Sequence, residues 1–352
     1  MASVAPPPVP PAGATTLSLS DFSNPARTRP DAKAMFEVLT TGGSDPNSIF
    51  HSVTGDGVTF MSDVPVSTLG GVDVVLGIDE AGRGSVLGPM TYSAAYWAVS
   101  KAEEMEAKGF DDSKALTPET RRKLFDKIEA TEDCGYVVRV LQASEISRNM
   151  LRKTPYNLNE MSHDSAIEMI RAVQKTGVNV TKCIIDTVGI PEAYLRKLDR
   201  AFHGQGIEFI VEKKADANYK VVSAASICAK VARDTITPNW VFPEEGFVPV
   251  NGKEWNSGYP SDPKCKEWME KNLQDKVFGY PDVIRFSWRP VRDLLDNPEM
   301  AYKVTWEDEE EDEGQASITD FLGSSSNGKR KRQRLGGSKV QKGFERAEGF
   351  FF

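Results

Sequence analysis

Acidic residues stand at the ends of apolar segments, in a pattern that could hold metal ions. Asp79 and Glu80 directly follow the apolar run Val74–Ile78, Asp186 ends a second such run, and Asp216 follows a third by a few residues. Carboxylates grouped without histidine or cysteine are the hard oxygen ligands that Mg²⁺ or Mn²⁺ prefers. Two ions shared by such a group would support hydrolysis of a phosphodiester. Taken singly, each acid also fits an ordinary turn or helix N-cap residue.

A glycine-rich segment follows the first two acids. Gly82, Gly84 and Gly88 are spaced G-x-G-x-x-x-G, one residue away from the dinucleotide-binding fingerprint, and the residues after Pro89 favour a strand over a helix. This spacing excludes a nicotinamide-binding loop. Glycines without side chains would let the backbone approach a ligand closely, although an ordinary glycine-rich hairpin has the same composition.

The elements that must position these residues lie between residues 71 and 297, which we expect to fold as one unit. Strands are predicted over 74–78, 90–99, 136–141, 182–186 and 207–212, and helices from 117 and over 159–175, 191–202 and 221–235. The order predicts a mixed sheet flanked by helices. On the first helix, Leu124, Phe125 and Ile128 form the apolar face, and Arg121 is expected to point outward.

The two ends of the chain have a different composition. Residues 1–70 are rich in proline, glycine, serine and threonine and predict a mostly disordered extension. Residues 298–352 predict a flexible tail with an acidic run at 307–313 and the basic cluster Lys329–Arg334. The net charge of −8 restricts any phosphate-binding surface to a local patch. No apolar run is long enough to span a membrane, and the spacing of the four cysteines favours reduced thiols.

Blocks of sequence in one order resemble the ribonuclease HII family, and the Asn-Leu-Asn and Phe-Ser-Trp blocks resemble its eukaryotic branch. They cover about residues 73–306. The blocks are Asp79–Gly84, Leu87–Met90, Asp112–Leu116, Tyr156–Asn159, Asp186–Gly189, Lys214–Asp216, Val222–Asp234, Gly258–Pro263 and Arg285–Trp288.

This resemblance implies an α/β, ribonuclease H-like fold, with a mixed five-stranded sheet flanked by helices and a small C-terminal helical part. It implies two Mg²⁺ or Mn²⁺ ions held by the four acids Asp79, Glu80, Asp186 and Asp216. The family's 2′-hydroxyl contacts fall on Gly82, Arg83, Gly84 and Tyr259, and the hydroxyl is what separates RNA from DNA at one nucleotide. Its contacts near the scissile phosphate and the DNA backbone fall on Lys114 and Lys230.

The implied activity is that of an endoribonuclease. It would cut 5′ of ribonucleotides in RNA–DNA hybrids and at single ribonucleotides in duplex DNA, giving a 3′-hydroxyl and a 5′-phosphate. The eukaryotic branch works with two accessory subunits in a heterotrimer. A non-catalytic nucleic-acid adaptor is the alternative, but it would predict a substitution among the four acids, and none is substituted. The Gly-Arg-Gly element and Tyr259 argue against a junction resolvase of the same fold.

The tail carries two further candidate motifs. Gln315, Ile318, Phe321 and Leu322 resemble a peptide that binds the sliding clamp, with leucine where a second aromatic residue is usual. The basic cluster Lys329–Arg334 predicts import into the nucleus, and a basic linker that binds nucleic acid loosely is the alternative.

Overall fold

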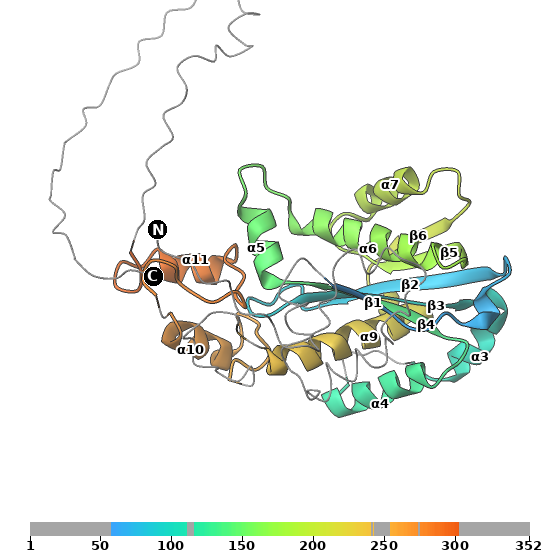
Figure 1. The fold of residues 1–352 in the computed structure, drawn as a ribbon, viewed down its shortest axis with the longest axis horizontal. Coiled ribbons are helices and arrows are strands. Elements are labelled where there is room, and N and C mark those ends of the chain that lie inside the picture. Colours follow the sequence, from blue (N-terminus) through green and yellow to red (C-terminus); the bar gives the residue numbers. More distant parts are fainter. Residues whose placement is uncertain (1–57, 111–115, 241, 243–253, 274, 303–352) are drawn as a thin grey trace, which may run out of the picture. The chain divides into compact units, whose positions relative to one another are not determined.

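The computed structural model describes residues 58–110, 116–240, 242, 254–273 and 275–302. The chain divides into a unit of residues 1–303 and a unit of residues 304–352, and every described residue belongs to the first. Most of the predicted N-terminal extension and nearly all of the predicted tail therefore lie outside the described residues. The described part is a sheet with helices on both faces (Figure 1).

Within the described residues, six strands form one sheet in the order β1-β4-β3-β2-β5-β6. β2 is antiparallel to β3 and parallel to β5, so the sheet is mixed as predicted. The strands are β1 (Val58–Met61), β2 (Asp73–Ala81), β3 (Met90–Ala98), β4 (Gly135–Leu141), β5 (Asn179–Asp186) and β6 (Glu208–Glu212).

The predicted count of five strands is wrong, because β1 pairs with β4 at the edge of the sheet. This strand has four residues, and only Phe60 among them is buried. A single buried side chain gives no alternating pattern that could be recognised in the sequence. β1 also lies before residue 71, where the folded unit was expected to begin.

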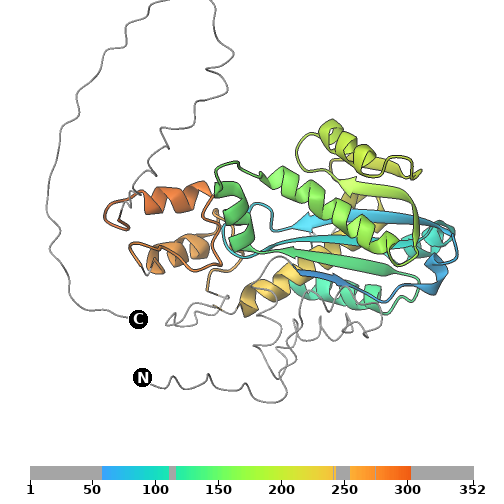
Figure 2. The same ribbon diagram turned by 45° about the horizontal axis from the view of Figure 1, so that its top comes forward.

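The helices cover both faces of the sheet. α6 and α7 lie on one face, and α9, with α4 packed against it, lies on the other (Figures 1 and 2). The helices are α3 (Ala102–Ala107), α4 (Pro118–Glu129), α5 (Ala143–Leu151), α6 (Leu158–Gln174), α7 (Pro191–Ala201), α8 (Ala215–Asn218), α9 (Lys220–Ile236), α10 (Pro263–Lys271) and α11 (Arg289–Leu295), with single turns at Val66–Thr68, Val99–Lys101 and Thr237–Asn239.

Alternation along β2 divides the core between the two faces of the sheet. Leu76 and Ile78 pack with α6 and α7, whereas Val75 packs with α9. Gly77 also faces α9, and a Cβ atom at this position would lie 2.5 Å from the main-chain carbon of Val221. The helix backbone therefore rests directly on the strand, and glycine is the residue that permits this approach.

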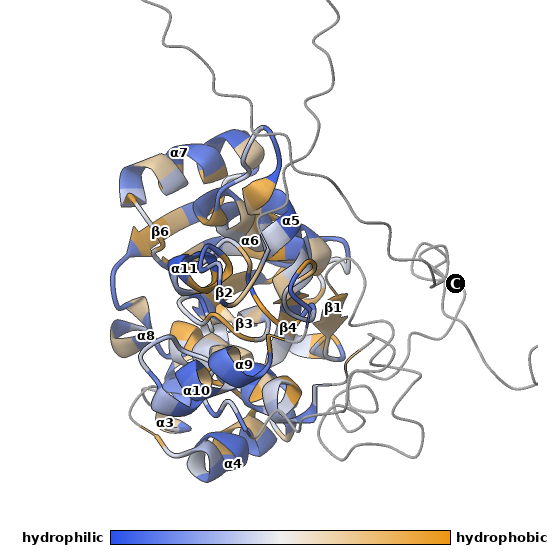
Figure 3. Cartoon of the chain, turned by 90° about the vertical axis from the view of Figure 1, so that its left-hand side faces the viewer, coloured by the Kyte–Doolittle hydropathy of each residue, from blue (hydrophilic) through white to orange (hydrophobic). Residues whose placement is uncertain are grey.

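Local signals explain where two of the helices begin. The Thr117 side chain accepts a hydrogen bond from the Thr120 amide, and Pro118 occupies the first helical position of α4, as predicted. The Asn157 side chain accepts from the amides of Asn159 and Glu160 and begins α6. The outer helices α4 and α7 are largely hydrophilic on the exposed side (Figure 3).

The structure also tests two inferences from composition. All four cysteines are buried and free, as predicted, and burial raises the pKa of Cys134 to about 12. Among the described helices, none combines the length and the apolar character that a membrane span needs.

Candidate active site

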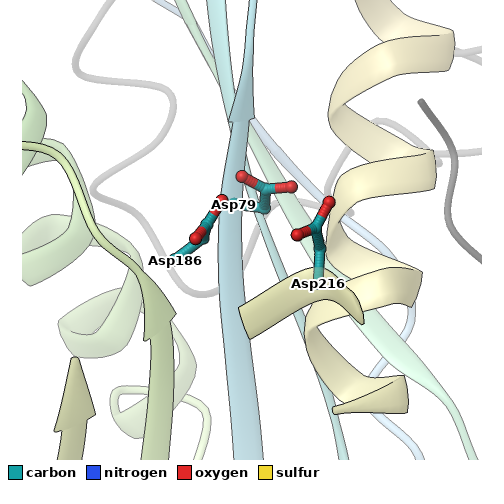
Figure 4. A group of neighbouring side chains, drawn as sticks. All are labelled: Asp79, Asp186 and Asp216. Carbon is teal, nitrogen blue, oxygen red and sulfur yellow. The ribbon is translucent and has the colours of Figure 1, made fainter. Parts of the chain in front are cut away.

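Three of the predicted carboxylates meet at one edge of the sheet. The side chains of Asp79, Asp186 and Asp216 each place one oxygen within 4.8 Å of the others (Figure 4). Parallel pairing sets Ile78 of β2 beside Ile185 of β5, so the residue that follows each of them is an aspartate at the same level. Asp79 and Asp216 are buried and Asp186 is half-buried.

The third aspartate is brought in by the short helix α8. Lys214 adopts a left-handed conformation with φ of 60° and turns the chain from β6 into α8. The Ala215 amide then donates to Asp186 Oδ1 at 3.2 Å, and the Ser223 hydroxyl donates to the Asp216 carbonyl. These bonds tie α8 to both β5 and α9, and they fix the position of the Asp216 carboxylate.

The donor set fits a divalent cation. Three carboxylates in a mostly buried group repel one another strongly unless a positive charge lies among them. All three donors are oxygens, which suits Mg²⁺ or Mn²⁺ better than zinc or copper. The group can therefore hold a metal ion that acts on a phosphate.

The fourth predicted ligand, Glu80, lies outside this group. It follows Asp79 on β2, where successive side chains point to opposite faces, and its amide donates to Asp79 Oδ1 at 2.7 Å. In the register of β2 and β3, Glu80 lies opposite Tyr92. Tyr92 belongs to the core between the sheet and α6. Burial, and after it the negative charge of Glu80, raises the pKa of Tyr92, which agrees with a Glu80 side chain on this face of the sheet.

Two buried arginines hold the glycine-rich loop that follows Asp79. Arg285 is fully buried and donates to the carbonyls of Gly82 at 2.8 Å, Arg83 at 2.9 Å and Gly88 at 3.1 Å. Gly82 and Gly88 both have positive φ, of 80° and 78°, so the loop follows a path that glycine permits. With these carbonyls turned inward to one guanidinium, the shape of the loop is fixed from inside.

The second arginine, Arg233 of α9, joins this loop to the segment that carries Tyr259. Arg233 donates to the carbonyls of Leu87 at 3.3 Å, Pro89 at 2.7 Å and Ser257 at 2.9 Å. Its guanidinium carbon also lies 6.0 Å from the centre of the Tyr259 ring. One buried cation thus sets the distance between the two segments.

The predicted ribonucleotide-recognition residues lie side by side. Gly84 is exposed, and a Cβ atom on it would lie 3.3 Å from Cε1 of Tyr259. The Gly258 carbonyl accepts hydrogen bonds from the Val86 amide at 2.8 Å and the Leu87 amide at 3.1 Å. Residues far apart in the sequence therefore form one surface, and its loop begins three residues after Asp79.

The Arg83 side chain turns away from this surface. Its guanidinium donates to the Ser162 hydroxyl at 2.8 Å and to the Asn159 side-chain oxygen, both on α6. The backbone of Arg83 remains between Gly82 and Gly84. This arrangement agrees with recognition through the main chain at this residue.

The two predicted phosphate-binding lysines differ in what the structure describes. Lys230 of α9 is half-buried, and its ammonium lies 3.2 Å from Asp234 Oδ1. Burial lowers the pKa of Lys230, while Asp234 opposes that shift. Lys114 lies outside the described residues, as do Gln315, Ile318, Phe321, Leu322 and the basic cluster of the tail.

Sequence reasoning assigned no role to Arg233 or Arg285. Both follow buried apolar residues, Val231–Ala232 and Val283–Ile284. A cation within an apolar segment needs polar partners and is a usable signal. Arg121 carries no such signal, because it stands in the polar run 119–123. It is only 6% exposed and contacts α9, so the prediction that it points outward is wrong.

Known proteins resemble this chain in fold and in sequence. The crystal structure of ribonuclease H2 from Pyrococcus horikoshii OT3 matches with a TM-score of 0.52 and 31% identity, over 63% of this chain and 97% of that one. The model of the ribonuclease HII family matches residues 76–291. The A subunit of ribonuclease H2 from Bos taurus is 45% identical over 254 residues, 71% of this chain and 83% of the relative. Its Neurospora crassa counterpart is 41% identical over 281 residues, 77% of this chain and 85% of the relative.

The fold and the carboxylate site define a metal-dependent ribonuclease H, a hydrolase that acts on nucleic acid. The resemblance seen in the sequence blocks and the predicted ribonuclease H-like fold are both confirmed. The chain belongs to the ribonuclease HII family, in the branch formed by the A subunits of eukaryotic ribonuclease H2.

Proposed function

We propose that this ribonuclease H cuts the phosphodiester 5′ of a ribonucleotide, both in RNA–DNA hybrids and at single ribonucleotides in duplex DNA. The products are a 3′-hydroxyl and a 5′-phosphate. One observation carries the proposal: the loop that brings Gly84 against Tyr259 begins at Gly82, three residues after Asp79 of the aspartate group. The chain connection between the two groups supports the proposal that one cuts the phosphate while the other contacts the sugar.

We assign the metal site to Asp79, Asp186 and Asp216. Glu80 lies outside that group, next to Asp79 on β2, and we propose it as the further ligand of the second of two Mg²⁺ or Mn²⁺ ions. When bound, two such ions activate a water molecule and stabilise the leaving oxygen. The protein holds the carboxylates in place before substrate arrives, through the pairing of β2 with β5 and the Ala215 amide. Placement fixed in advance is what makes charge stabilisation effective in a transition state.

Recognition of the ribonucleotide is assigned to the backbone of Gly82, Arg83 and Gly84 together with the Tyr259 ring and hydroxyl. A site built around a hydroxyl rejects the analogue that lacks it, because its own polar groups are then left without partners. Lys114 and Lys230 are assigned to phosphates of the duplex, which they would bind by charge.

Partners and location follow from the relatives and the tail. Each of the eukaryotic relatives is named as one subunit of ribonuclease H2, and we propose that this chain likewise assembles with two accessory subunits. We assign Gln315, Ile318, Phe321 and Leu322 to the sliding clamp, and Lys329–Arg334 to import into the nucleus. The biological task is then the removal of ribonucleotides from DNA, and of RNA primers or hybrids.

The test uses the full chain purified with the subunits that accompany it. Three labelled duplexes are incubated with magnesium or with EDTA: an RNA–DNA hybrid, a DNA duplex with one ribonucleotide, and the same duplex without it. We expect cuts in the first two with magnesium alone, mapped to the 5′ side of the ribonucleotide. Cleavage of the all-DNA duplex, or of the single-ribonucleotide duplex in EDTA, would contradict the proposal.

A further inference from the structure

A buried arginine links α4 to α9 beside the predicted phosphate-binding lysine. Arg121 lies on α4, and its Nε and Nη2 atoms contact Asp234 Oδ2 of α9 at 3.1 and 2.6 Å. Its Nη1 atom donates to the carbonyl of Leu116. The side chain is 7% exposed, so both contacts lie where solvent screens charge little.

Asp234 stands between two cations. One carboxylate oxygen faces Arg121, and the other lies 3.2 Å from the ammonium of Lys230, one helical turn earlier on α9. Among these three side chains, one carries a negative charge and two carry positive charges. Lys230 is the more exposed of the two cations, at 28% against 7% for Arg121.

α9 runs alongside the strand and the loop that carry Asp79 and the glycines. Val221 of α9 packs on Gly77 of β2, and Arg233 packs on Gly82, so the helix follows the strand past the level of Asp79. Lys230 lies three residues before Arg233 on that helix. Lys230 therefore belongs to the part of α9 that lies between the levels of Gly77 and Gly82, as Asp79 does.

We propose that Arg121 is a positioning residue that neutralises Asp234 and so leaves the charge of Lys230 available to a substrate phosphate. Without Arg121, Asp234 would pair with Lys230 alone, and the pair would be neutral toward the duplex. The inference rests on the proposed function, since it assigns a phosphate of the nucleic acid to Lys230. It assigns Arg121 no contact with substrate.

The first experiment is a double-mutant cycle on the full enzyme with its accompanying subunits. KM and kcat for the single-ribonucleotide duplex are measured over a range of salt concentrations for wild type, Arg121→Gln, Lys230→Gln and the double variant. Each single change is expected to raise KM by about fivefold to tenfold. Each is also expected to lower the slope of log KM against log salt by about one, as the loss of one phosphate contact does. The double variant is expected to match Lys230→Gln, because Arg121 acts through that lysine.

A second comparison separates charge from structure. Asp234→Asn in the Arg121→Gln background removes the acid that captures Lys230, so we expect it to restore the salt slope and most of KM. Arg121→Lys, which keeps the charge, is expected to keep the slope. Arg122→Gln is the matched control, because Arg122 is on the same helix but its side chain is 40% exposed and is paired with Asp126. Thermal unfolding of each variant shows whether it is folded.

The outcomes distinguish failure of the proposed cleavage activity from failure of the role assigned to Arg121. Wild-type enzyme that does not cut the duplex would overturn the proposed function and this inference with it. Wild-type cleavage with additive losses in the double variant would overturn the inference alone. Failure of Asp234→Asn to restore the slope in a folded Arg121→Gln protein would overturn it too, because a purely structural role of Arg121 predicts that result.

Discussion

Replacing Asp216 by Asn should stabilise the protein when metal is absent and remove most of its activity when metal is present. The substitution keeps the shape of the side chain and removes one charge from the aspartate group. In EDTA the repulsion of Asp216 by Asp79 and by Asp186 is then lost, so the folded state gains stability. With magnesium, the site offers one charged ligand fewer to the ions, so activity falls. The substitution therefore raises stability without metal and lowers activity with metal.

The magnitude follows from the geometry of the group. The three oxygens lie within 4.8 Å of one another, and two unit charges at that distance repel by about 3.5 kcal/mol in an effective dielectric of about 20. Asp216 takes part in two such pairs, one with Asp79 and one with Asp186. Asp186 is half-buried, and hydrogen bonds to the carboxylates offset part of the repulsion, so we expect a net gain of about 2 kcal/mol. For a domain of this size that is a rise of about 4 to 8 °C in Tm.

The assay is thermal unfolding in EDTA and in saturating magnesium, together with turnover on the single-ribonucleotide duplex. Magnesium should raise the Tm of wild type more than that of Asp216→Asn, because tighter binding of a ligand stabilises the folded state more. Turnover should fall by about 10³-fold. Asp199→Asn, an exposed change of equal charge on α7, should leave both quantities unchanged. A lower Tm for Asp216→Asn in EDTA, or turnover near wild type, would refute the metal-site assignment.

Three further predictions address other parts of the molecule. Tyr259→Ala should reduce kcat/KM for a single ribonucleotide more than for a continuous hybrid, because neighbouring 2′-hydroxyls in the hybrid offer other contacts. Tyr259→Phe, which removes only the hydroxyl, should show how much of that loss comes from the hydroxyl and how much from the ring. Equal losses on both substrates would contradict a role of Tyr259 in selectivity. Gly77→Ala should destabilise the fold by about 3 kcal/mol in urea unfolding, since its Cβ would overlap the Val221 backbone, and an unchanged midpoint would contradict that packing. Ile318→Ala with Phe321→Ala should abolish binding to the sliding clamp and leave cleavage of short duplexes unchanged. Calorimetry of the wild-type tail peptide with the clamp tests this, and the absence of binding heat would contradict the assignment of the motif.

The sequence was sufficient to predict the convergence of Asp79 and Asp186, because both follow short apolar runs and parallel neighbouring strands end at one edge. It predicted Asp216 less directly, since that residue reaches the group only through the left-handed turn at Lys214. The position of Glu80 could not be predicted from that of its neighbour Asp79. Adjacent acids look like one pair in sequence, but on a strand they point to opposite faces of the sheet.

The buried arginines show what sequence patterns do not reveal. On α4, Arg121 belongs to a run of three basic residues, and such a run ordinarily faces water. Only the contact with Asp234, far away in the sequence, accounts for its burial. Arg285 donates to three main-chain carbonyls. Every residue has a main-chain carbonyl, so the sequence does not show which carbonyls will accept from a buried arginine. Partners of this kind become visible only when the chain is folded.

One measurement tests the central claim most directly: end-mapped cleavage of a DNA duplex with a single ribonucleotide, by wild type and by Asp79→Asn in saturating magnesium. Asp79 is buried at the centre of the group, between β5 and α8. The account predicts one cut 5′ of the ribonucleotide by wild type and at least about 10³-fold less product from folded Asp79→Asn. Equal cleavage by the two proteins would contradict it, as would a wild-type cut at any other bond.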